Sequence, residues 1–407
     1  MSQYQLIVYG ATSFVGQLLT RYLVQTYGVN QQLRWAIAGR SASKLAQVKK
    51  DLGKAANDLA VIIADAHDES ALASMCQRTQ AVVSTVGPYA LYGSTLVKVC
   101  AEQGTDYCDL TGEPQWIAQM IDQYQSMAQA SGARIVHCCG FDSLPSDLGT
   151  FFLQQIAQQR FGRPFTRVKL RVKAIRGGFS GGTVASMMEL IKQAADNPEL
   201  RRFMANPYAL CPPSSQTLPK QPNLNFAEYD KDAQAWSAPF VMAGINTKVV
   251  HRSNALSGYK YGTAFEYDET MLTGRGLLGS MLAAGTAVGL ASFVAVTALP
   301  FTRPLVEKIV PQAGEGPSPR QQEKGFFDIR LFGIGQQGEK LTVKVTGDRD
   351  PGYGSTAKML GEAAVCLACD IPKTEATGGF WTPATLLGER LIMRLTQRAG
   401  LAFAELR

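Results

Sequence analysis

Histidine is scarce in this sequence: His67, His137 and His251 are the three among 407 residues. A hydrolase built on serine, histidine and an acid also needs its nucleophile on a sharp turn between a strand and a helix. We find no such turn in the sequence, and His137 falls inside a predicted core strand, where a histidine is typically a packed core residue. We therefore do not expect a serine hydrolase.

Paired cysteines and blocks of like charge are also lacking. The eight cysteines are scattered, and Cys366 and Cys369 have no second pair to complete a zinc site, so we expect buried thiols and no metal. The net charge of +7 arises without the lysine and arginine blocks of nucleic-acid-binding arms, so we expect no nucleic-acid partner. The first predicted strand begins almost at once, which leaves no room for a signal peptide and favours a cytoplasmic location.

The first stretch of the chain has the pattern of a nucleotide-binding unit. An apolar run at residues 6–9 leads into a turn of small residues, and an amphipathic segment follows. Such a turn lets the backbone approach a pyrophosphate, whose charge the N-terminus of the helix attracts. Ser13 stands at the middle position, where glycine is usual, which makes the fit looser, and an ordinary strand–helix turn is the alternative. The predicted cofactor-binding residues of this turn are Gly10, Ala11, Thr12, Ser13, Phe14, Val15 and Gly16.

The end of the second predicted strand, residues 33–40, indicates which dinucleotide is bound. An acid at this position would hold the 2′-hydroxyl of NAD, whereas an arginine suits the 2′-phosphate of NADP. Here the strand ends in Arg40, followed by Ser41 and Lys44, so we expect NADP(H). Asp65, at the end of the third predicted strand, is a candidate for contact with the adenine or for a routine helix cap.

Strands alternate with helices to about residue 145, which predicts an α/β fold with a Rossmann-type, doubly wound parallel sheet. The predicted strands continue at residues 80–89, 105–110 and 134–140, with helices at 94–103 and 114–130. Ligands of such sheets lie at the carboxyl ends of the strands. This places five further residues in the predicted cofactor site, namely Val86, Gly87, Pro88, Cys139 and Gly140.

Several motifs together resemble one family, the saccharopine dehydrogenase-like oxidoreductases. They lie at residues 10–16, 38–40, 84–89, 107–113 and 139–147, and later blocks at 180–183 and 352–359 also match. The resemblance is greatest to the branch that includes the trans-acting enoyl reductases of mycobacterial lipid synthesis. It implies an NADP(H)-dependent reductase with an inserted substrate domain, and enoyl reduction as its activity. It does not specify the substrate.

The chain beyond residue 145 is predicted to form an inserted α+β substrate or dimer domain, residues 146–349. We expect an antiparallel sheet, an irregular excursion at 206–240, and a glycine-rich turn at 177–183 that either holds an anionic or carbonyl group or is a flexible turn. Residues 350–407 are expected to form helices that pack back on the first domain. The predicted strands of the inserted domain are 166–175, 240–250, 259–270, 325–332 and 340–346.

An uncharged segment, residues 276–302, interrupts these strands between Arg275 and Arg303. It is long enough to cross a bilayer, for which about 20 apolar residues suffice. A single crossing would separate strands that we assign to one sheet, so a helix that dips into one leaflet or covers a substrate tunnel is favoured over a span. A buried core or dimer helix is a further alternative. The expected partners are thus a hydrophobic small molecule, a membrane or lipid surface through 276–302, or a second copy of the chain.

The proton donor of a reductase is not evident from the sequence. Candidates near the predicted crevice are Tyr89, Tyr107, Asp109 and Asp142, each of which has a packed tyrosine or a helix-capping acid as its alternative. The resulting hypothesis is an NADPH-dependent oxidoreductase that reduces an activated C=C or C=O bond of a hydrophobic, lipid-like substrate. The rival is a membrane- or lipid-associated scaffold or redox sensor that binds NADP(H) without turnover, because fold alone does not establish chemistry.

Overall fold

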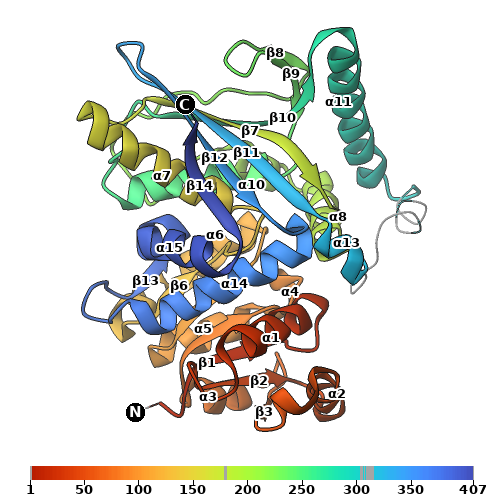
Figure 1. Cartoon of the computed structure of the whole chain (residues 1–407), viewed down its shortest axis with the longest axis vertical. Coiled ribbons are helices and arrows are strands. Elements are labelled where there is room, and N and C mark those ends of the chain that lie inside the picture. The colour runs from red at the N-terminus through yellow and green to blue at the C-terminus, as the bar shows by residue number, and fades with distance from the viewer. Residues whose placement is uncertain (1, 178–180, 303–305, 307, 309–315, 407) are drawn as a thin grey trace. The chain divides into compact units, whose positions relative to one another are not determined.

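The structure is a computed structural model that describes residues 2–177, 181–302, 306, 308 and 316–406 (Figure 1). The chain divides into two compact units. The first consists of residues 1–141, 313–317 and 352–400, and the second of residues 142–312, 318–351 and 401–407.

The first unit is built on a sheet of seven parallel strands in the order β13-β6-β5-β4-β1-β2-β3. The strands are β1 (Tyr4–Tyr9), β2 (Trp35–Gly39), β3 (Ala60–Ile63), β4 (Thr79–Ser84), β5 (Asp106–Asp109), β6 (Arg134–Val136) and β13 (Gly379–Trp381). The central strands are buried along nearly their whole length, as expected of a parallel sheet covered on both faces. The predicted Rossmann-type fold is confirmed.

The helices of the first unit lie between its strands or in the C-terminal segment. They are α1 (Phe14–Tyr27), α2 (Ala42–Leu52), α3 (Glu69–Cys76), α4 (Tyr89–Tyr92), α5 (Ser94–Gln103), α6 (Pro114–Ser131), α14 (Thr356–Val365) and α15 (Gly388–Arg398). Helix α5 packs between α3 and α6 and contacts both. Helix α14 packs against α1 and contacts β4 and β5. The C-terminal segment also supplies β13, which extends the sheet beside β6 and which the sequence analysis did not predict.

The second unit contains a seven-stranded mixed sheet in the order β14-β12-β11-β7-β10-β9-β8. Its strands are β7 (Arg167–Arg176), β8 (Glu228–Asp230), β9 (Ala235–Pro239), β10 (Glu266–Gly274), β11 (Phe326–Ile334), β12 (Lys340–Gly347) and β14 (Leu401–Leu406). Its helices are α7 (Leu144–Phe161), α8 (Gly181–Asp196), α9 (Pro198–Ala205), α10 (Ala243–Leu256), α11 (Gly276–Ala298) and α13 (Pro319–Glu323).

Three predictions for this region are wrong. The expected strand 240–250 lies largely in helix α10, whose residues from Ile245 to Ala255 are almost all buried because α7 and β10 pack around it. The sheet is not wholly antiparallel, since β7 and β10 run parallel. The last residues of the segment 350–407 do not join the C-terminal helices, because they form β14 and pair with β12.

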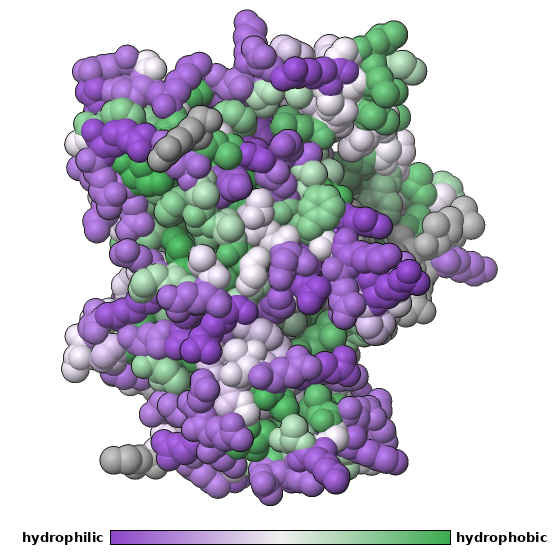
Figure 2. Space-filling model, in the orientation of Figure 1, coloured by the Kyte–Doolittle hydropathy of each residue, from purple (hydrophilic) through white to green (hydrophobic). Residues whose placement is uncertain are grey.

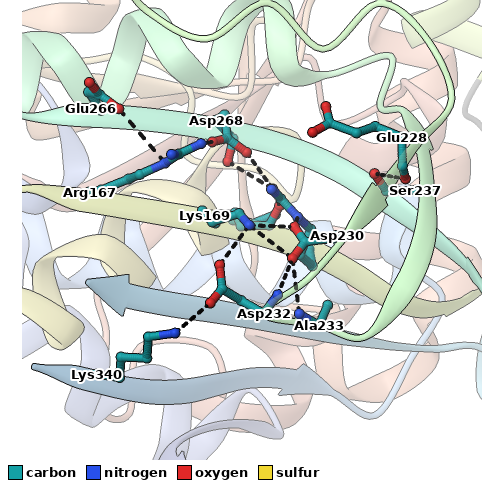
Figure 3. A network of polar contacts seen from close by, with 12 residues as sticks. Arg167, Lys169, Glu228, Asp230, Asp232, Ala233, Ser237, Glu266, Asp268 and Lys340 are labelled. Atoms are coloured by element: carbon teal, nitrogen blue, oxygen red, sulfur yellow. Dashed lines mark hydrogen bonds and ion pairs between the residues drawn. The ribbon is translucent and has the colours of Figure 1, made fainter. Parts of the chain in front are cut away.

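Strand β7 has two chemically different faces. Val168, Leu170 and Val172 are buried, and the alternate residues Arg167, Lys169 and Arg171 enter a network of ion pairs. Figure 3 shows this network, which also includes carboxylates from β10, from the end of β8 and from the turn between β8 and β9. Lys169 Nζ lies 2.8 Å from Asp230 Oδ2, and Arg171 Nε lies 2.6 Å from the same oxygen. Because side chains alternate along a strand, one face builds the core and the other a polar layer.

Helix α11 is the apolar segment of the sequence analysis and leaves most of its surface exposed (Figures 1 and 2). It has 23 residues and is long and apolar enough to cross a membrane, yet only 11% of its most apolar window is buried. The alternative of a helix buried in the core of its own chain is therefore wrong. Strand β7 pairs with β10, which precedes α11, and with β11, which follows it, so the two flanking strands belong to one sheet as predicted.

Candidate functional site

The turn between β1 and α1 owes its shape to two glycines. Gly10 has a φ of +85°, in the region that favours glycine, and a Cβ there would lie 2.5 Å from Val86 Cγ2. A Cβ on Gly16 would lie 2.2 Å from the carbonyl oxygen of Gly10. A side chain at Gly10 would therefore collide with the turn after β4, and one at Gly16 would push the turn away from the helix, as expected where backbone must approach a pyrophosphate.

Ser13 supports this turn from within. Its Oγ accepts a hydrogen bond from the Gly16 amide at 2.9 Å and donates one to Thr85 Oγ1 at 3.0 Å. Thr85 Oγ1 donates in turn to the Gly10 carbonyl oxygen at 2.9 Å, so the turns after β1 and β4 are joined. The residue at the middle position, where glycine is usual, is therefore the N-cap of α1, and its departure from the pattern preserves the strand–turn–helix geometry.

The residues predicted to read the adenosine end lie at the ends of β2 and β3. Arg40 and Lys44 are exposed, and Arg40 makes no ion pair with any residue that the structure describes. Ser41 is the N-cap of α2, its Oγ accepting from the Lys44 amide at 3.4 Å. Asp65 is half-buried, and its Oδ1 accepts from the His67 amide at 3.0 Å. An exposed guanidinium at this strand end is suited to a 2′-phosphate.

Asp109 joins the loops that follow β5 and β6. Its Oδ2 accepts from Tyr107 Oη at 3.0 Å and lies 2.7 Å from His137 Nδ1. Its Oδ1 accepts from the amides of Thr111 at 3.1 Å and Cys138 at 3.2 Å. Asp109 is fully buried, so the carboxylate holds both loops in place and has its acceptor positions occupied.

The two candidate tyrosines are enclosed in the same region. Tyr89 Oη donates to the Ser84 carbonyl at 3.0 Å, and Tyr107 Oη donates to Asp109. Burial, and then the charge of Asp109, raises the pKa of both phenols well above the ordinary value. Both tyrosine rings are therefore packed in the core, and their hydroxyl groups are held by hydrogen bonds within the fold. Their part in proton transfer stays a prediction.

Sequence reasoning missed two partners in this region. The Glu113 carboxylate accepts from the amides of Tyr89 and Ala90, both at 2.9 Å, and so caps α4 from a distant loop. His137 meets Asp109, but its Nε2 is buried and makes no hydrogen bond within the described part of the chain. No local sequence pattern predicts the contact of Glu113 with Tyr89 or that of His137 with Asp109, because the partners are more than twenty residues apart in the sequence.

The predicted residues Cys139 and Gly140 follow β6. The Cys139 amide donates to the Asp109 carbonyl at 2.7 Å. A Cβ on Gly140 would lie 3.1 Å from Leu110 Cβ and 3.3 Å from Thr356 Cγ2, so this backbone packs tightly against the loop after β5 and against α14. These residues and the turns at 10–16 and 85–88 all follow the carboxyl ends of parallel strands, the edge where such sheets bind ligands.

Asp142 is half-buried and belongs to the second unit, in the turn before α7. Of the glycine-rich turn predicted to hold a substrate group, residues 178–180 lie outside the described residues. Helix α8 begins at Gly181, within the predicted turn 177–183.

A buried acid of the second unit was not predicted at all. The Glu269 carboxylate accepts from Tyr267 Oη at 2.6 Å and from Asn246 Nδ2 at 2.9 Å, and Ser143 Oγ donates to Asn246 Oδ1 at 2.9 Å. Burial raises the pKa of Glu269 to about 7, although these hydrogen bonds oppose the shift. The group gains or loses a proton near neutral pH, a property frequent in functional sites.

A cavity of about 670 Å³ lies at the opposite, amino edge of the parallel sheet. Asp106 and Arg134, which line it, form a buried ion pair with 2.5 Å between Arg134 Nη2 and Asp106 Oδ2, and Lys373 Nζ lies 2.6 Å from Asp106 Oδ1. Lys373 Nζ also donates to the carbonyl oxygens of Gly104 and Gly132, the residues that follow the C-terminal ends of α5 and α6. These charges are engaged in fastening the C-terminal segment to the sheet, so we do not assign the cofactor to this cavity.

Known proteins match the chain over nearly its full length. Residues 6–136 match the saccharopine dehydrogenase NADP-binding domain. A Mycobacterium tuberculosis protein provisionally named a trans-acting enoyl reductase is 40% identical over 404 residues, covering 97% of this chain and 95% of that protein. The trans-acting enoyl reductase of Mycobacterium ulcerans is 35% identical over 405 residues, covering 97% and 96%. The chain belongs to the saccharopine dehydrogenase-like oxidoreductases.

Solved structures agree with the fold of this saccharopine dehydrogenase-like chain. Saccharopine dehydrogenase of Saccharomyces cerevisiae matches with a TM-score of 0.56 and 12% identity, covering 98% of this chain and 99% of the other. Homospermidine synthase of Legionella pneumophila matches with a TM-score of 0.52 and 10% identity, covering 99% and 91%. At such low identity these neighbours bear on the fold alone.

The saccharopine dehydrogenase-like oxidoreductase uses NADP(H) as its cofactor, as predicted from Arg40 and its neighbours. The two glycines of the first turn and the exposed guanidinium fit that group. The family predicted from the motifs is confirmed, and the chain is an NADP-dependent oxidoreductase.

Proposed function

We propose that this oxidoreductase uses NADPH to reduce the activated C=C bond, an enoyl group, of a hydrophobic, lipid-like substrate. The observation that carries the proposal is the full-length similarity to proteins named trans-acting enoyl reductases, at 35–40% identity. An activated C=O bond would accept hydride by related chemistry, so a carbonyl substrate is the nearest variant of the proposal.

The residues have distinct tasks in this proposal. The turn at Gly10–Gly16 receives the pyrophosphate at the start of α1, and Arg40 receives the 2′-phosphate. NADPH supplies the hydride when bound, while the protein supplies orientation and a proton. Asp109 keeps the loops after β5 and β6 in one arrangement. Among the candidate donors, Asp109 and Tyr107 are hydrogen-bonded to each other.

The apolar helix α11 supports a lipid-like substrate. A soluble protein rarely leaves so many large apolar side chains exposed on one element without a use for them. Leu277 is 78% exposed and Leu278 is 70% exposed. We propose a cytoplasmic protein that associates peripherally with membranes, where a lipid-like substrate would be concentrated.

The second candidate function is an NADP(H)-binding scaffold or redox sensor without turnover. One observation favours it: Tyr89, Tyr107 and Asp109, three of the four candidate donors, are buried and hydrogen-bonded to structural partners.

NADPH oxidation separates the two. The purified protein would be mixed with NADPH and with trans-2-enoyl thioesters of increasing chain length, and absorbance of the reduced nicotinamide would be followed. Reductase activity predicts oxidation that becomes more efficient with chain length, whereas a sensor binds NADPH and leaves it reduced. In parallel, Arg40→Ala should weaken NADPH binding by about tenfold to a hundredfold, the loss expected for a charge-assisted hydrogen bond, and leave NADH binding unchanged. Equal weakening of both would contradict the assigned role of Arg40.

A further inference from the structure

The fully buried residues of helix α11 form one narrow stripe of small side chains. Its buried residues are Gly279, Ala283 and Thr297. At about 100° per residue these three project within roughly 40° of one another around the helix axis. A Cβ on Gly279 would lie 2.4 Å from the Gly274 carbonyl oxygen, so the first turn lies directly on the end of β10. The helix is held close to the sheet at this stripe.

Most of the remaining circumference is apolar, and its side chains are exposed or half-buried. Its large exposed side chains are Leu277, Leu278, Met281, Leu282, Val288 and Val294, with exposed fractions from 42% to 78%. By the same helical geometry they project over an arc of roughly 240°. A single partner helix would cover one stripe of this surface. A fluid apolar medium would cover the whole arc.

The composition of α11 suits the hydrocarbon of a bilayer, and the pairing of the strands on either side excludes a single crossing. There is no charged residue from 276 to 302, and helical hydrogen bonds satisfy the backbone within the segment, as a lipid environment requires. The strands before and after α11 both pair with β7, so the chain must return to the side from which it entered. Exposed Arg275 stands at the N-terminus of the helix, and the chain carries a net charge of +7, which suits anionic headgroups.

We infer that α11 lies in the plane of an anionic phospholipid bilayer, with its exposed arc among the headgroups and the upper acyl chains. Helices that lie in this plane are immersed by roughly 5–10 Å. The stripe at Gly279, Ala283 and Thr297 stays against the sheet and holds the second unit at the membrane surface. This inference does not depend on the enoyl chemistry, because binding requires neither cofactor nor turnover.

Vesicle flotation of the full chain tests the inference. Wild-type protein should float with vesicles made of equal parts phosphatidylcholine and phosphatidylglycerol, and less with phosphatidylcholine alone. The variant L278Q/M281Q/L282Q should lower the partition coefficient at least about tenfold, because three apolar side chains leave the lipid. Phe226→Gln is the matched control: this side chain is 80% exposed in the same unit but lies outside α11, and its loss should leave binding unchanged.

A second measurement locates the helix in the bilayer and guards against misfolding. The tryptophan of a Leu282→Trp variant should fluoresce less with vesicles of brominated lipid than with vesicles of unbrominated lipid if the side chain is immersed, because bromine quenches tryptophan. NADPH binding by the triple variant should remain at the wild-type value, which shows that the chain is folded. The inference is overturned if wild-type protein does not float, if the triple variant floats equally, or if α11 instead mediates a dimer that the triple variant dissolves without any vesicle binding. Oxidation of NADPH by a short, soluble enoyl thioester should be the same in the triple variant, so failure here and failure of the reductase proposal are separable.

Discussion

Replacing Gly16 with alanine tests whether the first turn depends on close approach of backbone to helix. The new Cβ would lie 2.2 Å from the Gly10 carbonyl oxygen, 2.9 Å from Ala11 Cα and 2.9 Å from Ser13 Oγ. The first two neighbours are backbone atoms, which cannot rotate away. The turn would have to open by about 1 Å to reach ordinary contact distances.

The cost follows from two effects. Forcing an extra methyl group into a packed site destabilises by about 1–3 kcal/mol. Opening the turn also weakens the N-cap hydrogen bond from the Gly16 amide to Ser13 Oγ, worth about 1 kcal/mol. We expect a loss of roughly 2–4 kcal/mol in the free energy of unfolding of the first unit, and NADPH binding weakened by at least about tenfold because a 1 Å displacement misplaces the phosphate-binding amides.

Urea denaturation followed by circular dichroism gives the free energy, and quenching of protein fluorescence gives the NADPH affinity. Gly244→Ala is the matched control, because it is the same substitution in a helix with no atom within 4 Å of the added Cβ. It should leave stability unchanged or raise it by up to about 1 kcal/mol. A Gly16→Ala protein within about 0.5 kcal/mol of wild type, with unchanged NADPH affinity, would refute the steric reasoning.

Two further predictions concern buried carboxylates of the second unit. Burial raises the pKa of Glu269 from its ordinary 4.5 to about 7, so the folded chain holds this proton more tightly than the unfolded chain. Stability of wild type relative to Glu269→Gln should therefore fall as pH rises from about 4.5 to 7, by up to about 3 kcal/mol; a flat difference across that range would contradict the assignment. Burial alone would raise the pKa of Asp230, but Arg171 and Lys169 outweigh it and hold that pKa below its ordinary value. Asp230→Asn should cost about 1.5–3 kcal/mol in urea denaturation at neutral pH, because Lys169 and Arg171 lose their shared partner but keep Asp232 and Asp268, whereas the exposed Asp58→Asn should change little.

Local sequence determines the nucleotide-binding end of this protein. An apolar run, a turn of small residues and an amphipathic segment are neighbours in the chain, so their sterics and hydrogen bonds hold wherever they occur. The need for glycine at positions 10 and 16 was predictable from the turn itself, and the structure gives the reason: a Cβ at Gly10 would clash with the turn after β4, and one at Gly16 with the backbone of the same turn. The position of Arg40 at the ligand-binding edge was predictable because it directly follows β2, and strand ends share one edge of a parallel sheet; its contact with the 2′-phosphate stays a prediction.

Contacts between distant segments were decided by the tertiary structure alone. The segment 240–250 was predicted as a strand, yet it lies largely in helix α10, where the surrounding α7 and β10 bury polar and apolar residues alike. Asp109 and His137, or Glu269 and Asn246, become partners only after strands from different parts of the chain align. The strand β14 and the exposure of α11 are likewise properties of the folded chain, since pairing and burial depend on what packs nearby and not on the residue's own neighbours in sequence.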